Sequence, residues 1–149
     1  MATEYITIAE ADAIFERVID TDPYDDASTS EKNKAIKQAT DVIDRLNFVG
    51  EKADDDQVLQ FPRDADTTIP DDIKIACSLI MLALLDGVDM EIEFDNLNMV
   101  SQGISSIRAT YRTNRTSEHI AAGVPSVTAW RYLKPYLRDQ KSILVHRVS

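Results

Sequence analysis

The residue pattern that comes closest to a chemical site is the acidic segment at residues 20–31. Counted as a twelve-residue calcium loop, it has side-chain oxygens at loop positions 1, 3, 7, 9 and 12. Tyr24 stands at position 5, where it chelates poorly, and Asp25 replaces the glycine that position 6 needs for its sharp turn. The segment is therefore interpreted as a solvated acidic loop, with calcium binding as the minor alternative.

Side chains that could carry out catalysis are few and scattered. The two histidines are His119, in a polar stretch, and His146, near the C-terminal end, and no motif in the sequence pairs either of them with a catalytic base or acid. The single cysteine, Cys77, lies in an apolar run and reads as a small buried hydrophobe, which excludes an internal disulfide framework. With 4 glycines, the chain also has no glycine-rich phosphate loop. The sequence therefore predicts no enzyme, no cofactor and no metal site.

The charge of the chain is divided between its two parts. Residues 1–100 contain 24 Asp/Glu and 8 Lys/Arg, a net of −16, whereas residues 101–149 contain 2 and 8, a net of +6, which together give the net charge of −10. Blocks of opposite sign favour head-to-tail association of copies, which can close into a ring. Two other interpretations stay open: a partner or polyanion recognises the basic part, or this part only neutralises the acidic body.

Aromatic residues accompany the basic ones in the last third of the chain. Arginine next to aromatic side chains can bind single-stranded nucleic acid through charge and stacking. Trp130 and Leu133 at helical spacing are, however, more typical of a core, and the acidic body repels a phosphate backbone. The basic residues are Arg108, Arg112, Arg115, Arg131, Lys134, Arg138, Lys141 and Arg147, and the aromatic ones are Tyr111, Trp130, Tyr132 and Tyr136.

Two capping boxes predict the starts of the first two helices. Thr7 is followed by Glu10 and Ser28 by Glu31, so that in each pair the hydroxyl accepts a helix N–H and the glutamate reaches back. Apolar residues then recur at helical spacing. The first helix is expected to run to about residue 19, and the second to stop near Gly50.

A third helix is expected to form the centre of the core. Pro70 suits its first turn, the stretch Ile73–Leu85 is apolar on nearly every face, and Gly87 is its predicted stop. The connection before it, residues 51–69, is predicted to be irregular and to be held against the helices by Phe61.

The remaining residues predict short elements and a tail. Alternation around Ile104–Tyr111 predicts a minor β element, residues 113–123 a polar loop, and the stretch from Pro125 to Pro135 a short helix. The fold class is mainly α: a small bundle of three main helices plus a short C-terminal helix, forming one domain over residues 1–137. An extended tail follows at residues 138–149.

The tail contains an apolar patch between basic residues. Apolar residues at a chain terminus indicate either a surface for a partner or a segment that folds back on its own core. The predicted docking residues are Arg138, Lys141, Ile143, Leu144, Val145 and Arg147.

No segment of the sequence indicates secretion or membrane insertion. The N-terminal residues have no basic region followed by an apolar core. The longest apolar stretch is 11 residues, from Ile75 to Leu85, whereas a membrane-spanning helix needs about 20. The chain is therefore expected to be cytosolic and soluble when it is made, without a membrane partner.

Several short sequence segments together resemble one family of tailed bacteriophages. The family is that of the head–tail connector, or adaptor, proteins beneath the portal, and relatives with the same opening are also labelled DnaT-like single-strand-binding proteins. The shared segments are Tyr5-Ile6-Thr7-x-x-Glu10-Ala11, Ala39-Thr40-x-x-Ile43-Asp44, Gln60-Phe61-Pro62-Arg63, Ile69-Pro70 and Leu133-Lys134-Pro135-Tyr136-Leu137.

This resemblance implies a structural virion protein at the head–tail junction, assembled in the host cytoplasm. Its copies would form a ring, a dodecamer, that extends the DNA channel between the portal protein and a downstream tail or nozzle protein. The C-terminal tail would dock on the portal or on a neighbouring copy. Arg108, Arg112 and Arg115 would face the channel or an interface and make non-specific contact with packaged DNA. The alternative is a single-stranded-DNA-binding replication module.

Overall fold

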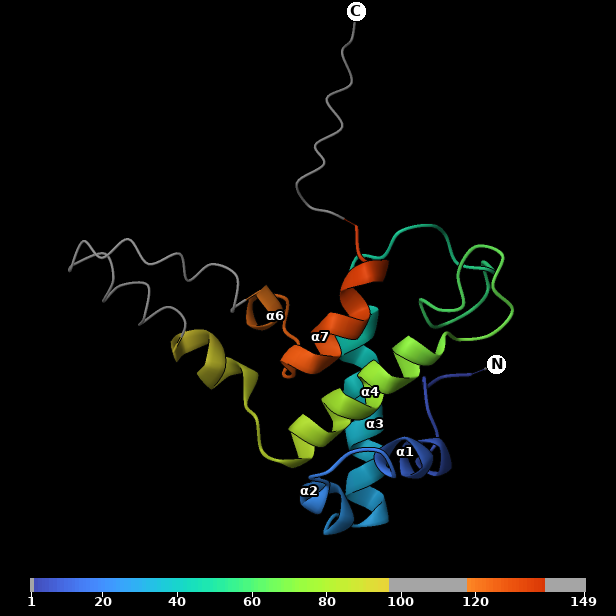
Figure 1. Cartoon of the computed structure of the whole chain (residues 1–149). Coiled ribbons are helices and arrows are strands. Elements are labelled where there is room, and N and C mark those ends of the chain that lie inside the picture. The colour runs from blue at the N-terminus through green and yellow to red at the C-terminus, as the bar shows by residue number, and fades with distance from the viewer. Residues whose placement is uncertain (1, 97–117, 139–149) are drawn as a thin grey trace, which may run out of the picture.

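The computed structural model describes residues 2–96 and 118–138. Its central element is α4 (Asp71–Leu85), which packs against α3 (Thr29–Asp44) on one side and α7 (Val127–Leu133) on another (Figure 1). Most of this part of the chain is helical, and it forms a small bundle around α4. The predicted fold class, a mainly α bundle, is confirmed.

The sequence of α4 explains its central place. Six of its residues are completely buried, whereas the apolar Ile75, Leu79 and Leu82 on another side of the helix are only partly buried. Gly87 ends the helix as predicted: it has a φ of +87°, and the N–H of Val88 donates to the carbonyl of Ala83 at 3.1 Å. Within the described residues, no helix is long and apolar enough to cross a membrane. The buried residues of α4 are Ile73, Ala76, Cys77, Ser78, Ile80 and Met81.

Both predicted capping boxes are present, at Thr7 with Glu10 and at Ser28 with Glu31. Glu10 also links α1 (Ile8–Phe15) to the central helix, because one of its carboxylate oxygens lies 2.7 Å from the ammonium nitrogen of Lys74. The hydrogen bond from Lys74 lowers the pKa of the Glu10 carboxyl. The N-terminal cap is thus also a contact between elements.

The first helix ends earlier than predicted, at Phe15 instead of about residue 19. The reason is that the chain turns so that the ring of Phe15 packs on Tyr24, with 4.5 Å between ring centroids. Tyr24 belongs to α2 (Asp22–Asp25), a one-turn helix inside the segment predicted as a loop. Its side chain is buried, and its hydroxyl donates to Asp12 at 2.6 Å.

The second predicted helix, α3, also ends early, at Asp44 instead of near Gly50. The residues that follow turn inward because Phe48 is buried and forms a bridge with Leu137. Gly50 has a φ of +81°, and a Cβ there would lie 2.2 Å from a carboxylate oxygen of Asp64. Only glycine fits that close approach.

The C-terminal part differs from the prediction in three details. A one-turn helix, α6 (Glu118–Ala121), lies inside the predicted polar loop, and the 3₁₀ helix η1 (Lys134–Tyr136) continues the chain through the predicted break at Pro135. Val127, predicted on the apolar side of α7, is 47% exposed because it stands in the first turn, before the helix packs on α4. The predicted β element at Ile104–Tyr111 lies outside the described residues.

Phe61 gives a direct test of how the long connection between α3 and α4 is held. Replacing Phe61 with alanine should lower the free energy of unfolding by about 3 kcal/mol or more, because its ring is 97% buried between three other rings. Val58→Ala is the matched control, since Val58 lies in the same connection and is 59% exposed. Equal denaturant midpoints for the two variants would show that the connection is not held by Phe61.

Candidate interaction surfaces

Three segments distant in the sequence meet at Tyr5, in the segment before α1. The backbone N–H of Tyr5 donates to the hydroxyl of Thr40 at 3.4 Å, and the hydroxyl of Tyr5 donates to the carboxylate of Asp44. The backbone N–H of Gln60 donates to the same two groups, at 3.1 Å to the Tyr5 oxygen and 3.1 Å to Asp44. Residues 16 to 55 positions apart thereby share one hydrogen-bond network.

The ring of Phe61 lies beside this network and joins it to the C-terminal helices. It packs edge-on against Phe48 at 4.7 Å, Tyr136 at 5.7 Å and Tyr5 at 6.3 Å, measured between centroids. The hydroxyl of Tyr136 donates to Asp72 at the start of α4, at 3.0 Å. One buried ring therefore contacts the N-terminal segment, the long connection and the end of η1.

Arg63 fastens the same connection through its guanidinium group. Its Nε donates to the carbonyl of Val49 at 2.9 Å, and its Nη2 donates to the carbonyl of Gly50. Its Nη1 donates to the backbone and side-chain oxygens of Gln60, at 3.2 and 2.9 Å. The planar fork of an arginine can serve several acceptors at once in this way. We name Tyr5, Asp44, Gln60, Phe61 and Arg63 the loop clamp.

Burial keeps three groups at or beside the loop clamp protonated near neutral pH. Burial, with the adjacent Asp44 and Asp72 carboxyls, raises the pKa of the Tyr5 and Tyr136 hydroxyls, so both remain protonated donors. Burial also raises the pKa of the Cys77 thiol to about 12, and the side chain is completely buried. The clamp is therefore a structural device.

The acidic segment at residues 20–31, which the calcium pattern singled out, folds around an inward-facing tyrosine. The hydroxyl of Tyr24 is directed to Asp12, and Asp25 accepts a hydrogen bond from Thr21 at 2.8 Å. In the described ranges, no three His, Cys, Asp or Glu side chains gather closely enough to hold a metal ion.

Of the predicted docking residues, the structure describes Arg138. Its backbone N–H donates to the carbonyl of Asn47 at 3.0 Å, and its Nε donates to that of Phe48 at 3.1 Å. Arg138 thus fixes the place where the tail leaves the body. The other predicted docking and channel residues lie outside the described ranges; they are Lys141, Ile143, Leu144, Val145, Arg147, Arg108, Arg112 and Arg115.

The aromatic residues of the C-terminal helices are engaged with the core. Trp130, Tyr132 and Tyr136 are partly buried and pack against the core cluster. The indole nitrogen of Trp130 is buried without a hydrogen-bond partner among the described residues. Lys134, which stands between them, pairs with Glu118 at 2.9 Å. These residues are therefore not arranged as an open platform on which bases could stack.

The described part of the chain is strongly acidic. It contains 25 Asp/Glu and 11 Lys/Arg, a net of −14, which leaves +4 for the remaining residues out of the total of −10. A body with this charge repels a phosphate backbone and attracts basic protein segments.

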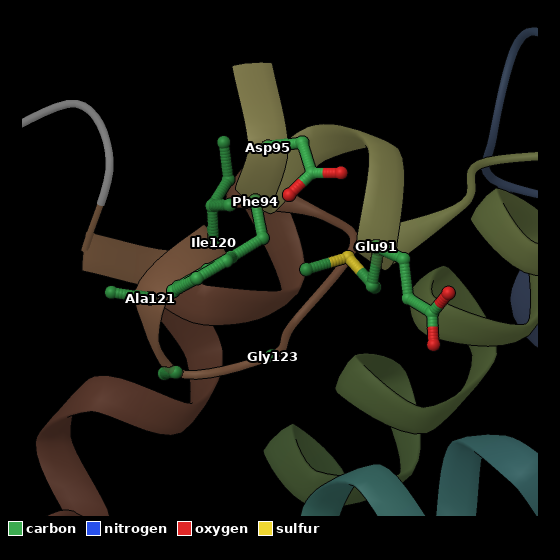
Figure 2. A pocket seen from close by; sticks show the side chains of 8 residues that line it. Glu91, Phe94, Asp95, Ile120, Ala121 and Gly123 are labelled. Atoms are coloured by element: carbon green, nitrogen blue, oxygen red, sulfur yellow. The ribbon is translucent and has the colours of Figure 1, made fainter. Parts of the chain in front are cut away.

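One concave surface lies between residues 90–96, which are helical, and the α6 region (Figure 2). Its volume is about 530 Å³, within the range of ordinary binding pockets. The sequence signal for it, which our sequence reasoning missed, is the spacing Met90/Phe94 beside Glu91/Asp95, each pair four residues apart on a helix. The lining residues are Met90, Glu91, Phe94, Asp95, Ile120, Ala121, Ala122 and Gly123.

Fold and surfaces define a small, acidic, mainly helical protein. Residues 2–148 match the model of a family described as "Putative DnaT-like ssDNA binding protein", and the chain belongs to this family. Neither the curated proteins nor the solved structures that were searched gave a match.

Arg63 allows the loop clamp to be tested. Arg63→Ala should lower the free energy of unfolding by about 2–4 kcal/mol, since it leaves three partly buried carbonyls without their donor. Arg63→Lys should recover only part of this loss, because an ammonium group cannot reproduce the fork. Arg17→Ala, at an exposed position, should change the stability by no more than about 0.5 kcal/mol. Full recovery by lysine would show that charge alone matters there.

Proposed function

We propose that this chain is a structural, non-catalytic subunit of the head–tail connector of a tailed bacteriophage. Its copies form a ring beneath the portal, continue the DNA channel and receive the tail. The observation that carries the proposal is the net charge of −14 on the described body. Such a surface suits contacts with basic protein segments, including the residues of a second copy outside the described ranges, which carry a net +4, and disfavours close contact with DNA.

The loop clamp supports the same proposal. All five of its residues come from the sequence segments that carry the resemblance to connector proteins, and they hold the long connection in which Phe48 accepts a hydrogen bond from Arg138. Residues that hold the protomer in one rigid shape are expected in a protein that functions by assembling with other subunits.

A second candidate, a single-stranded-DNA-binding module of replication, is favoured by the family description. This description names single-stranded-DNA binding and does not name a connector. Because the described body is acidic, DNA would have to contact the basic residues outside it. These are Arg108, Arg112, Arg115, Lys141 and Arg147.

The composition of the virion separates the two candidates. Virions purified from the phage that encodes this chain should contain it in a fixed ratio to the portal subunit, as measured by quantitative mass spectrometry. If both proteins form twelve-membered rings, the two should be present in equal numbers of copies. A replication protein has no reason to remain in the particle. Its absence from purified virions would overturn the connector proposal.

Binding to oligo-dT at several salt concentrations tests the second candidate directly. If the basic segment binds single strands, replacing Arg108, Arg112 and Arg115 with glutamine should reduce the salt slope by about 2, at about 0.7 per contact. The matched control replaces Lys32, Lys34 and Lys37 on α3, which removes the same charge from the body. Equal effects of the two triple variants would indicate a change in net charge only.

The tail can be removed without disturbing its attachment point. Truncation after Arg138 keeps the hydrogen bonds of that residue to Asn47 and Phe48, so the melting temperature should not change. Incorporation into particles should be lost, because Ile143, Leu144 and Val145 supply the apolar area for docking. Normal particles from the truncated chain would contradict the docking role of the tail.

A further inference from the structure

The pocket between residues 90–96 and the α6 region has an apolar floor and an acidic edge. Phe94 comes from the 90–96 helix, and Ile120 comes from α6 on the opposite side (Figure 2). Met90, which also lines the pocket, stands four residues before Phe94 and so lies on the same face of that helix. Glu91 and Asp95 lie along the same helix and place two carboxylates at the edge. An occupant of such a pocket must supply apolar side chains together with positive charge.

This end of the molecule exposes large apolar side chains both in the pocket and beside it. Phe94, in the lining, is 47% exposed; outside the lining, Ile92 on the 90–96 helix is 58% exposed, and Val127 stands exposed in the first turn of α7. Apolar side chains gathered at one end of a soluble protein indicate a surface that a partner covers.

We propose that this pocket receives the C-terminal tail of a second copy of the chain, with Ile143 and Val145 as the inserted side chains. The inference rests on the proposed assembly function and identifies the surface that receives the tail. In an extended chain, Lys141, Ile143, Val145 and Arg147 share one face, since side chains alternate, and Leu144 faces the other way. This face has an apolar centre and basic ends, which complements the apolar floor and acidic edge of the pocket.

The position of the tail favours a neighbouring copy over the same copy. Gly123 lies before α7, and the tail begins at Arg138, after α7 and η1, a path of about 16 Å along the two helices. From Arg138 to Ile143 the chain covers at most about 17–18 Å. Ile143 would reach its own pocket only with every intervening residue fully extended back along α7. A neighbouring copy imposes no such condition.

Disulfide cross-linking in the full-length chain tests the proposal. Ala121→Cys places a thiol on the lining of the pocket, and Val145→Cys places one on the inserted face of the tail. The natural Cys77 does not interfere, because it is completely buried. When the two single variants are mixed and mildly oxidised, a mixed disulfide between copies should form, identified by mass spectrometry of the linked peptides.

Two matched variants control for random collision. Leu144→Cys stands on the opposite face of an extended tail, and Ile19→Cys is fully exposed on the body, away from the pocket-lining residues. The pair Ala121→Cys with Val145→Cys should link several-fold faster than Ala121→Cys with Leu144→Cys, and faster than Ile19→Cys with Val145→Cys. Replacing Glu91 and Asp95 with Gln and Asn should slow the link, as should 1 M salt, which shortens the screening length to about 3 Å.

Three results would overturn the proposal. Equal linking rates for all pairs would mean collision only. A link formed within one copy of the Ala121→Cys/Val145→Cys double variant, and absent between copies, would assign the pocket to the chain's own tail. A disulfide between Ala121→Cys and Ile107→Cys within one copy, formed in place of any link to the tail, would assign the pocket to residues 97–117.

The test is independent of the test of function. If virions contain the chain but no mixed disulfide forms, only the pocket assignment fails. If the mixed disulfide forms but virions lack the chain, the connector proposal fails and the contact between copies remains.

Discussion

The fold depends on the buried side of one mostly apolar helix. Ile73, Cys77 and Ile80 of α4 are completely buried under the neighbouring helices, whereas Ile75, Leu79 and Leu82 are only partly buried. The helix α3 precedes it and α7 follows it at a distance of some forty residues, and both pack directly on it. The hydrophobic effect on this one segment therefore brings the two ends of the described chain into one core.

The second requirement is to hold a long connection that has little secondary structure of its own. An irregular segment leaves backbone carbonyls without regular partners, and Arg63 donates to those of Val49, Gly50 and Gln60. Phe61 adds a buried ring that touches both the N-terminal segment and η1. Phe61 also packs on Phe48, whose carbonyl accepts a hydrogen bond from Arg138, so the loop clamp and the attachment of Arg138 share a contact.

Charge relates this fold to its proposed work. The body is acidic, and positive charge is concentrated in residues 101–149. The basic residues of one copy are therefore attracted to the acidic body of another. For a connector, this arrangement gives contacts between protein subunits and leaves the basic segment available to DNA. In a single-strand-binding protein, the basic segment would bind the DNA and the acidic body would serve only as the scaffold to which that segment is attached. The family description favours the second possibility, and the surface of the described body favours the first.

The sequence by itself determined the helical class, the two capping boxes, the stop of α4 at Gly87 and the anchoring role of Phe61. These features follow from interactions between residues three to five positions apart, or from a uniformly apolar segment, and both are visible in one dimension. Only the tertiary structure decided that α1 and α3 end early, that Arg63 serves three carbonyls, and that a pocket with acidic edges forms beside α6. These features depend on contacts between residues tens of positions apart, where packing of rings such as Phe61 on Tyr136 outweighs local helix propensity.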